Sequence, residues 1–156
     1  MRPHAVSAIV FCLLATPACT DNTPSTPTPT PAFTVDGTWQ TDVAVSGQTA
    51  RMTWTLTQSG PSATGPVLVA LPNGIVLMNG SLAGTVSGAT AMAATLVYTI
   101  SVKAGAIPAQ PACSGQFGGT MNASAGAPAR MTGDFSVKAT TCTPPFSAGT
   151  LTLTKQ

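Results

Sequence analysis

Apolar and polar residues alternate strictly over several short segments, and this period of two constrains the fold more than any other feature. In residues 51–58, RMTWTLTQ, the apolar positions are Met52, Trp54 and Leu56, and threonines or arginine stand between them. Residues 96–102, 130–138 and 149–156 alternate in the same way. Because successive side chains of a strand point to opposite faces, this pattern predicts β-strands with one buried and one solvated face.

Glycine, proline and asparagine divide the chain into about eight expected strands. The pair Asn73-Gly74 between two apolar runs predicts a short hairpin, because both residues tolerate positive φ. Residues 88–96, GATAMAATL, have a helix-like composition, but the glycine and threonine around them favour a strand. In 130–138 the alternation places Met131, Phe135 and Val137 on the buried face. The strands are expected near 37–45, 50–58, 63–71, 75–86, 90–102, 113–123, 129–138 and 148–155.

The fold class that follows is all-β, in one domain over residues 33–156. Eight sequential strands with short links predict a single antiparallel up-and-down barrel, and a two-sheet β-sandwich is the alternative. Charged residues make up only 6% of the chain, but 44% of it is hydrophobic, which indicates a folded domain rather than a disordered one. The formal net charge is +2 with scattered basic residues, so no nucleic-acid partner is expected.

The first 32 residues have a different composition and predict export. A basic start and a short apolar run at 5–15 are typical of a secretory signal, expected at residues 1–18. The small residue Ala18 before Cys19 resembles a bacterial lipoprotein signal, although Thr16 stands where leucine is usual. That resemblance implies lipid attachment at Cys19, a membrane partner and a place in the bacterial cell envelope. Ordinary cleavage after Ala18, giving a soluble periplasmic or secreted protein, is the alternative.

A linker is expected between the lipid-anchor cysteine and the barrel, so that 19–32 form one unit. Residues 20–31 are rich in threonine and proline, which favours extended polyproline II and excludes a packed core. Such a segment spans roughly 35–40 Å at its usual rise per residue. A disordered linker without a spacing role would have the same sequence.

Two cysteines remain after the signal, and in an exported domain they most simply form a disulfide between Cys113 and Cys142. A metal site is the rival interpretation, but the spacing is not C-x-x-C and the mature chain offers no histidine. In an up-and-down barrel, both cysteines are expected at the same end.

The residue inventory argues against catalysis. His4 is the only histidine, and residues 33–156 contain no glutamate. A Ser-His-Asp or Cys-His system therefore cannot be assembled. The carboxylates that remain are Asp36, Asp42 and Asp134, and surface charge is their expected role. We expect no enzyme activity, no catalytic residue, no metal and no cofactor.

A further resemblance rests on Gly37-Thr38-Trp39 at the start of the first strand. It is similar to the Gly-x-Trp that opens the first strand of lipocalins and related barrels, the calycin group. The resemblance implies that Trp39 packs across the closed end of the barrel, where the family often has an arginine near the last strand above it. Here that strand carries Lys155 rather than arginine, and no Thr-Asp-Tyr motif is present.

The function expected from these features is a non-catalytic binding module for a small apolar ligand or lipid. A barrel of eight strands is just wide enough either to be filled by side chains or to hold one small ligand. The alternative is a surface interaction, glycan-binding or enzyme-inhibitor domain whose partner is an envelope or extracellular protein. The candidate ligand-binding residues, chosen by alternation, are Met52, Trp54, Tyr98, Phe117, Met121 and Phe135.

Overall fold

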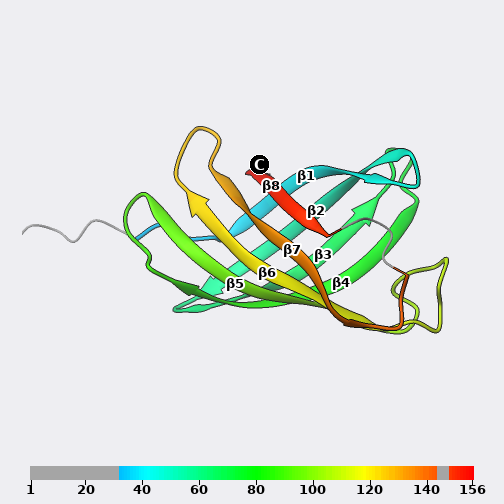
Figure 1. Ribbon diagram of the computed structural model, residues 1–156. Coiled ribbons are helices and arrows are strands. Elements are labelled where there is room, and N and C mark those ends of the chain that lie inside the picture. The colour runs from blue at the N-terminus through cyan, green and yellow to red at the C-terminus, as the bar shows by residue number, and fades with distance from the viewer. Residues whose placement is uncertain (1–31, 144–147) are drawn as a thin grey trace, which may run out of the picture.

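The computed structural model describes residues 32–143 and 148–156, which form a closed antiparallel barrel of eight strands (Figure 1). Each strand pairs with the next one in the chain, and the last pairs with the first, so the predicted up-and-down barrel is confirmed. The strands are β1 (Gly37–Val45), β2 (Gln48–Ser59), β3 (Ser62–Ala70), β4 (Val76–Ser87), β5 (Ala93–Val102), β6 (Gly115–Ser124), β7 (Arg130–Thr140) and β8 (Gly149–Lys155).

Some predicted features lie outside the described residues. These are the signal at 1–18, the lipid-anchor Cys19 and the linker at 20–31. Within the described ranges, no helix is long and apolar enough to span a membrane.

Two local expectations need correction. The fifth strand begins at Ala93 rather than at residue 90, because the Thr90 hydroxyl accepts the N–H of Ala93 and turns the chain. The hairpin at Asn73-Gly74 is present, but its loop covers residues 71–75 and only Gly74 has positive φ. The Asn73 side chain instead accepts the N–H of Ile75 at 3.2 Å. A two-residue turn in which both residues have positive φ occurs instead at Ser46-Gly47, between β1 and β2.

The inward-facing side chains form one apolar core, which the period-two pattern predicted with one exception. Val137 was expected on the buried face and is 38% exposed. The β6–β7 register shifts between Gln116 and Phe117, so the last part of β7 no longer follows the alternation of its first part. The largest fully buried side chains are Trp39, Trp54, Phe117 and Phe135.

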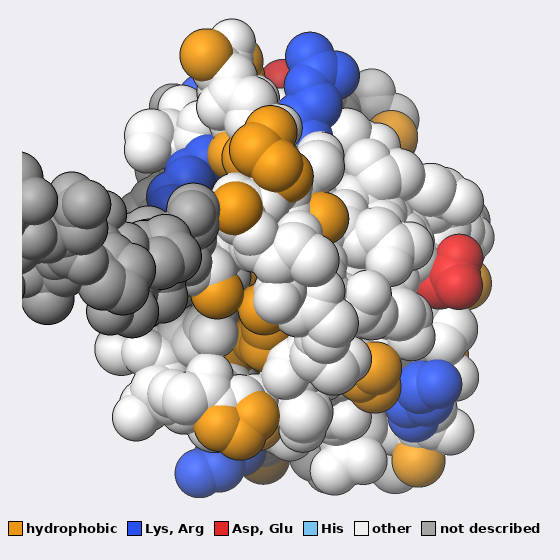
Figure 2. Space-filling model, turned by 90° about the vertical axis from the view of Figure 1, so that its left-hand side faces the viewer, with side chains coloured by type: hydrophobic (Ala, Val, Ile, Leu, Met, Phe, Trp, Pro, Cys, Tyr) orange, Lys and Arg blue, Asp and Glu red, His pale blue; other side chains and the backbone are white. Residues whose placement is uncertain are grey.

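One end of the barrel, which we call the Phe33 end, is closed by the residues that precede β1. Phe33 donates its N–H to the carbonyl of Thr90 in the β4–β5 loop. Val35 is fully buried, and its carbonyl accepts the indole N–H of Trp39 at 2.8 Å. The Lys155 ammonium lies 5.5 Å from the centroid of the Trp39 ring. Figure 2 shows this end, where hydrophobic atoms lie in several separate groups and charged side chains are few.

The opposite end, which we call the Cys113 end, is covered by the β5–β6 loop, residues 103–114. Ile107 of this loop is only 2% exposed and belongs to the barrel core. Cys113 and Cys142 form the predicted disulfide, with Cα atoms 4.9 Å apart, and both lie at this end as expected. Gln110 makes two hydrogen bonds to the backbone of Thr143, at 2.8 and 2.7 Å. The loop is therefore fastened to the segment after β7 by covalent and polar links.

The hydrogen-bonded pairing between β1 and β8 covers fewer residues than any other strand pair of the barrel. β1 pairs with β2 along its whole length, from Gly37 to Val45. It pairs with β8 only through Trp39 with Lys155 and Gln40 with Thr154. In Figure 1 the two strands lie side by side near the C-terminus and diverge toward the Cys113 end.

Candidate binding surfaces

The structure brings the six predicted ligand-binding residues together inside the barrel. All six belong to the single core cluster. The rings of Trp54 and Tyr98 are tilted, with centroids 4.8 Å apart. The rings of Phe117 and Phe135 are stacked, with centroids 5.5 Å apart. These are the distances of directly packed aromatic pairs.

Solvent access to these residues decides whether they line a cavity. A side chain that borders a water-sized cavity keeps some surface open to it. Met52, Trp54, Phe117 and Met121 are 0% exposed, and the other two predicted residues are 3% exposed or less. The space around these side chains is therefore filled by other side chains, and none of the six lines a hollow described below.

Tyr98 is 3% exposed and carries a polar group, its hydroxyl, inside the barrel. Its hydroxyl donates to the backbone carbonyl of Asp134 at 2.8 Å. A Cβ on Gly119 would lie 2.0 Å from that same carbonyl oxygen, so the site requires glycine. Burial, and secondarily the negative charge of Asp134, raises the pKa of Tyr98 above its ordinary value. Tyr98 is thus a neutral donor at physiological pH.

Trp54 differs from Tyr98 in that its polar group is not hydrogen-bonded to any described residue. Within the described part of the chain, its buried indole N–H has no hydrogen-bond partner. A buried donor without a partner is unfavourable by about 1–3 kcal/mol. Among the buried side-chain polar atoms of residues 32–143 and 148–156, it is the one that an acceptor atom of a ligand would pair.

The three carboxylates of the domain lie in separate environments. Asp36 accepts the N–H of Gln58, Asp42 pairs with Arg51, and Asp134 is exposed on β7. Asp36 and Asp42 are six residues apart along extended chain, which is roughly 20 Å and too far for a two-carboxylate hydrolase. Among the described residues, no three His, Cys, Asp or Glu side chains gather into a metal-binding group.

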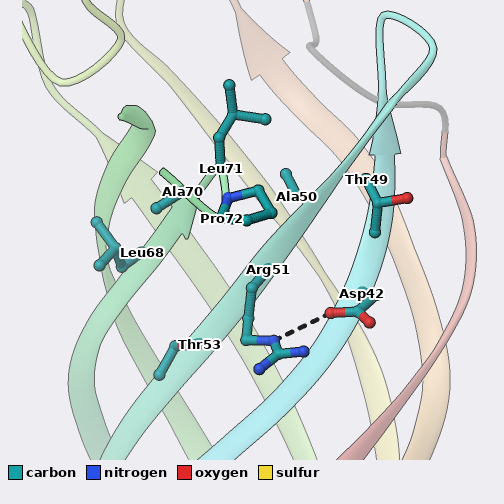
Figure 3. A pocket seen from close by; sticks show the side chains of 9 residues that line it. All are labelled: Asp42, Thr49, Ala50, Arg51, Thr53, Leu68, Ala70, Leu71 and Pro72. Carbon is teal, nitrogen blue, oxygen red and sulfur yellow. Dashed lines mark hydrogen bonds and ion pairs between the residues drawn. The ribbon is translucent and has the colours of Figure 1, made fainter. Parts of the chain in front are cut away.

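A hollow of about 520 Å³ lies on the outer face of β1, β2 and β3, and we call it the outer hollow (Figure 3). Arg51 reaches from β2 to Asp42 on β1, with Nε 3.0 Å from Oδ1. Leu68 of β3 lines the side away from Asp42 and is 38% exposed. The residues that line the outer hollow are Asp42, Thr49, Ala50, Arg51, Thr53, Leu68, Ala70, Leu71 and Pro72.

Exposed apolar side chains continue beyond this hollow. Ile75, the last residue of the loop that contains Leu71 and Pro72, is 55% exposed, and Val76 at the start of β4 is 38% exposed. The outer hollow therefore has an apolar side near the β3–β4 loop and a charged side at the Asp42–Arg51 pair.

A second hollow of about 320 Å³ lies where β8 meets β1, and we call it the seam hollow. It adjoins the outer hollow, because Asp42 and Arg51 line both. The residues that line the seam hollow are Gln40, Thr41, Asp42, Arg51, Thr152, Thr154 and Gln156.

Comparison of this chain with family models, with curated proteins and with solved structures gives no match. The chemistry of the surfaces is therefore the basis for any functional inference.

Sequence reasoning placed the candidate site in the interior and missed both hollows. One signal was present, since Leu68 is apolar at an outward position between the inward Val67 and Val69. The seam hollow has no such signal, because it depends on how far the first and last strands pair.

Proposed function

We propose that this chain is an exported, non-catalytic interaction module that a lipid on Cys19 holds at a bacterial membrane, and that it binds a protein partner through the outer hollow. The observation that carries the proposal is the contrast between the packed interior and the open outer face. The predicted ligand-binding residues are at most 3% exposed, whereas the outer hollow is open and partly apolar. Exposed apolar surface at the edge of a polar face is typical of protein interaction sites.

A protein partner is better supported than a glycan. Sugars are commonly held by stacking on exposed aromatic rings. Trp39, Trp54 and Tyr98 are all buried, and Phe33 is half-buried. In the described part of the chain, Phe117 and Phe135 are also at most 2% exposed.

The calycin-like interpretation is supported by the Phe33 end. Trp39 packs there in the core, and Lys155 of the last strand lies over its ring. This is the arrangement that the resemblance implies, with lysine in place of arginine.

A photo-crosslinking experiment tests the proposed surface. A photoreactive amino acid replaces Leu68 in the full chain, expressed in cells that produce the natural protein. The matched control replaces Val97, which is 53% exposed on the outer face of β5. We expect a discrete protein adduct from position 68 and none from position 97. Equal adducts at both positions, or none at either, would contradict the proposal.

The second candidate function, binding of a small apolar molecule inside the barrel, is favoured by the unpaired N–H of Trp54. Such a ligand would have to displace packed side chains and accept that hydrogen bond. A series of fatty acids and aromatic probes should then give a saturable change in tryptophan emission that is lost in Trp54→Phe. If no probe changes the emission, the interior is not a binding site for these classes.

A further inference from the structure

The β1–β8 ladder ends early and leaves two strand edges facing each other. The last paired residues toward the Cys113 end are Gln40 and Thr154. Beyond them, β1 continues to Val45 and the remainder of β8 extends back to Gly149. We call this stretch, Thr41–Val45 with Gly149–Leu153, the open seam. Within the described chain, neither of its two edges pairs with another strand.

Strand alternation shows which backbone groups face the open seam. In an antiparallel strand, the N–H and C=O of successive residues point to opposite neighbours. Gln40 pairs with β8, and the carbonyl of Thr38 accepts the N–H of Gln156, so the even-numbered residues of β1 face β8. The backbone groups of Asp42 and Ala44 therefore point into the seam.

On the facing strand, the same alternation applies. Lys155 donates its N–H to Ala129 beside β7, so the odd-numbered residues of β8 face away from β1. The backbone groups of Thr150 and Thr152 therefore face the seam. Unpaired strand edges of this kind are templates for an added strand.

Several of the apolar side chains along the open seam are less completely buried than those of the neighbouring strand. Val43 and Val45 point inward but are each 8% exposed, whereas Met52 and Trp54 on the neighbouring strand are fully buried. Leu151 on the other edge is half-buried. The apolar core is therefore less completely covered along the open seam. On the outside, the seam hollow is polar, lined mainly by threonine, glutamine and one ion pair.

From this geometry we propose that the open seam is a docking site for an extended segment of a partner polypeptide, which adds as a strand to the edge of β1. The segment would place apolar side chains inward over Val43 and polar side chains outward beside Asp42. It would be uncharged, because the Asp42–Arg51 pair neutralises the only charges that line the seam hollow. This inference rests on the proposed function and specifies how that partner binds.

A short peptide of defined chemistry tests the proposal. The probe is a fluorescent acetyl-Thr-Val-Thr-Val-Thr-amide, and the control is the same peptide with methylated amide nitrogens. We expect saturable binding of the probe to the full chain by fluorescence anisotropy, and no binding of the methylated peptide. In the free protein, hydrogen exchange at Asp42 and Ala44 should be faster than at Gln40, and the probe should slow it.

A single substitution can block the seam-facing edge of β1 without disturbing the pairing of β1 with β2. Ala44→Pro removes the seam-facing N–H, and proline is tolerated where that group faces away from a paired strand. The matched control is Ala44→Ser, which keeps the N–H. We expect Ala44→Pro to weaken probe binding by about two- to tenfold, since it removes one backbone hydrogen-bond donor. Ala44→Ser should bind like the parent, and both variants should keep the parent's melting temperature.

Several results would overturn the inference. If the amides of Asp42 and Ala44 exchange as slowly as that of Gln40 in the free protein, the seam is closed and the inference is wrong. Equal probe affinity for the parent and Ala44→Pro would also reject it. A concentration-dependent dimer that disappears in Ala44→Pro would replace the partner segment by a second copy of the chain. If the Leu68 adduct persists in Ala44→Pro, the partner uses the outer hollow without the seam, and the proposed function survives alone.

Discussion

Tyr98 joins two strands that are not neighbours in the barrel. It belongs to β5, but its hydroxyl donates to a backbone carbonyl of β7, across β6. Gly119 of β6 makes this possible, because no side chain stands between the hydroxyl and the carbonyl. One side-chain hydrogen bond thus links β5 to β7 across the strand that lies between them.

The first prediction concerns alkaline stability. Burial raises the pKa of Tyr98 above its ordinary value near 10, so the folded state favours the neutral phenol. This contribution to stability is fully present below about pH 10 and is lost as the pH rises above that value, because the unfolded chain releases the proton first. The free energy of unfolding should fall there by at most about 1.4 kcal/mol per pH unit.

Tyr98→Phe is the control for this prediction, because Tyr98 is the only tyrosine of the chain. Urea denaturation at a series of pH values measures both proteins. The variant should be less stable than the parent by about 1–3 kcal/mol at neutral pH, since the Asp134 carbonyl loses its donor. The difference in free energy of unfolding between the two proteins should decrease above about pH 10, because there the parent loses the contribution of the neutral Tyr98. A constant difference would show that Tyr98 does not titrate differently in the two states.

The second prediction concerns Gly119. Gly119→Ala would place a methyl group 2.0 Å from the Asp134 carbonyl oxygen, which forces β6 and β7 apart. We expect a loss of about 1–3 kcal/mol or more in the free energy of unfolding, as for other overpacked sites. Gly149→Ala is the matched control, because nothing lies within 4 Å of the Cβ it would add. Equal midpoints of thermal unfolding for the two variants would contradict the steric argument.

Among the elements, the β5–β6 loop behaves as a fixed cover rather than a free loop. It inserts Ile107 into the core, and the Asn79 N–H of β4 donates to the carbonyl of Ala106. Its far side is fastened by the disulfide and by Gln110. A long loop at the end of a barrel thus becomes part of the packed interior.

The third prediction is the contribution of the disulfide. The variant Cys113→Ser/Cys142→Ser should lose roughly 2–4 kcal/mol of stability, because the unfolded chain regains the freedom that the cross-link removed. Guanidinium denaturation in oxidising buffer measures the loss. Hydrogen exchange should at the same time become faster at Ile107. An unchanged midpoint would show that Gln110 and the apolar contacts hold the loop without the bridge.

The strands were predictable from sequence because their pattern is local. The strands bury alternate residues over most of their length, apart from the register shift between β6 and β7. A slip of one residue would expose a whole face, so the period of two fixes which face is buried. The turns were less predictable, since Thr90 and Asn73 act through side-chain hydrogen bonds that composition does not reveal. The disulfide was predicted from the two cysteines that remain after the signal, and its place at one end of the barrel from strand order. The open seam did not, because the extent of β1–β8 pairing is a property of barrel closure and not of either strand alone.

At the scale of the whole molecule, the fourth prediction concerns the anchor. The apolar run before Ala18-Cys19 and the linker after it predict a lipid on Cys19. Cys19→Ser should release the protein from the membrane fraction. The Cys113→Ser/Cys142→Ser variant is the control, since it changes cysteines without touching the signal. Mass spectrometry of the wild-type N-terminus checks the lipid directly, and an unmodified Cys19 in a wholly soluble protein would disprove it.

The two chain ends of the barrel lie at the same place, and this makes the molecule suitable for circular permutation. Gln156 bonds to Thr38, and Val35 bonds to the neighbouring Trp39. A short peptide joining the ends, with new termini opened between Asn73 and Gly74, would keep every strand pair. The described chain enters the barrel at the Phe33 end, whereas Gly74 lies in the loop between β3 and β4 at the Cys113 end. A segment fused at Gly74 would therefore join the permuted barrel at the Cys113 end, and any anchor it carried would hold the barrel in the inverted orientation.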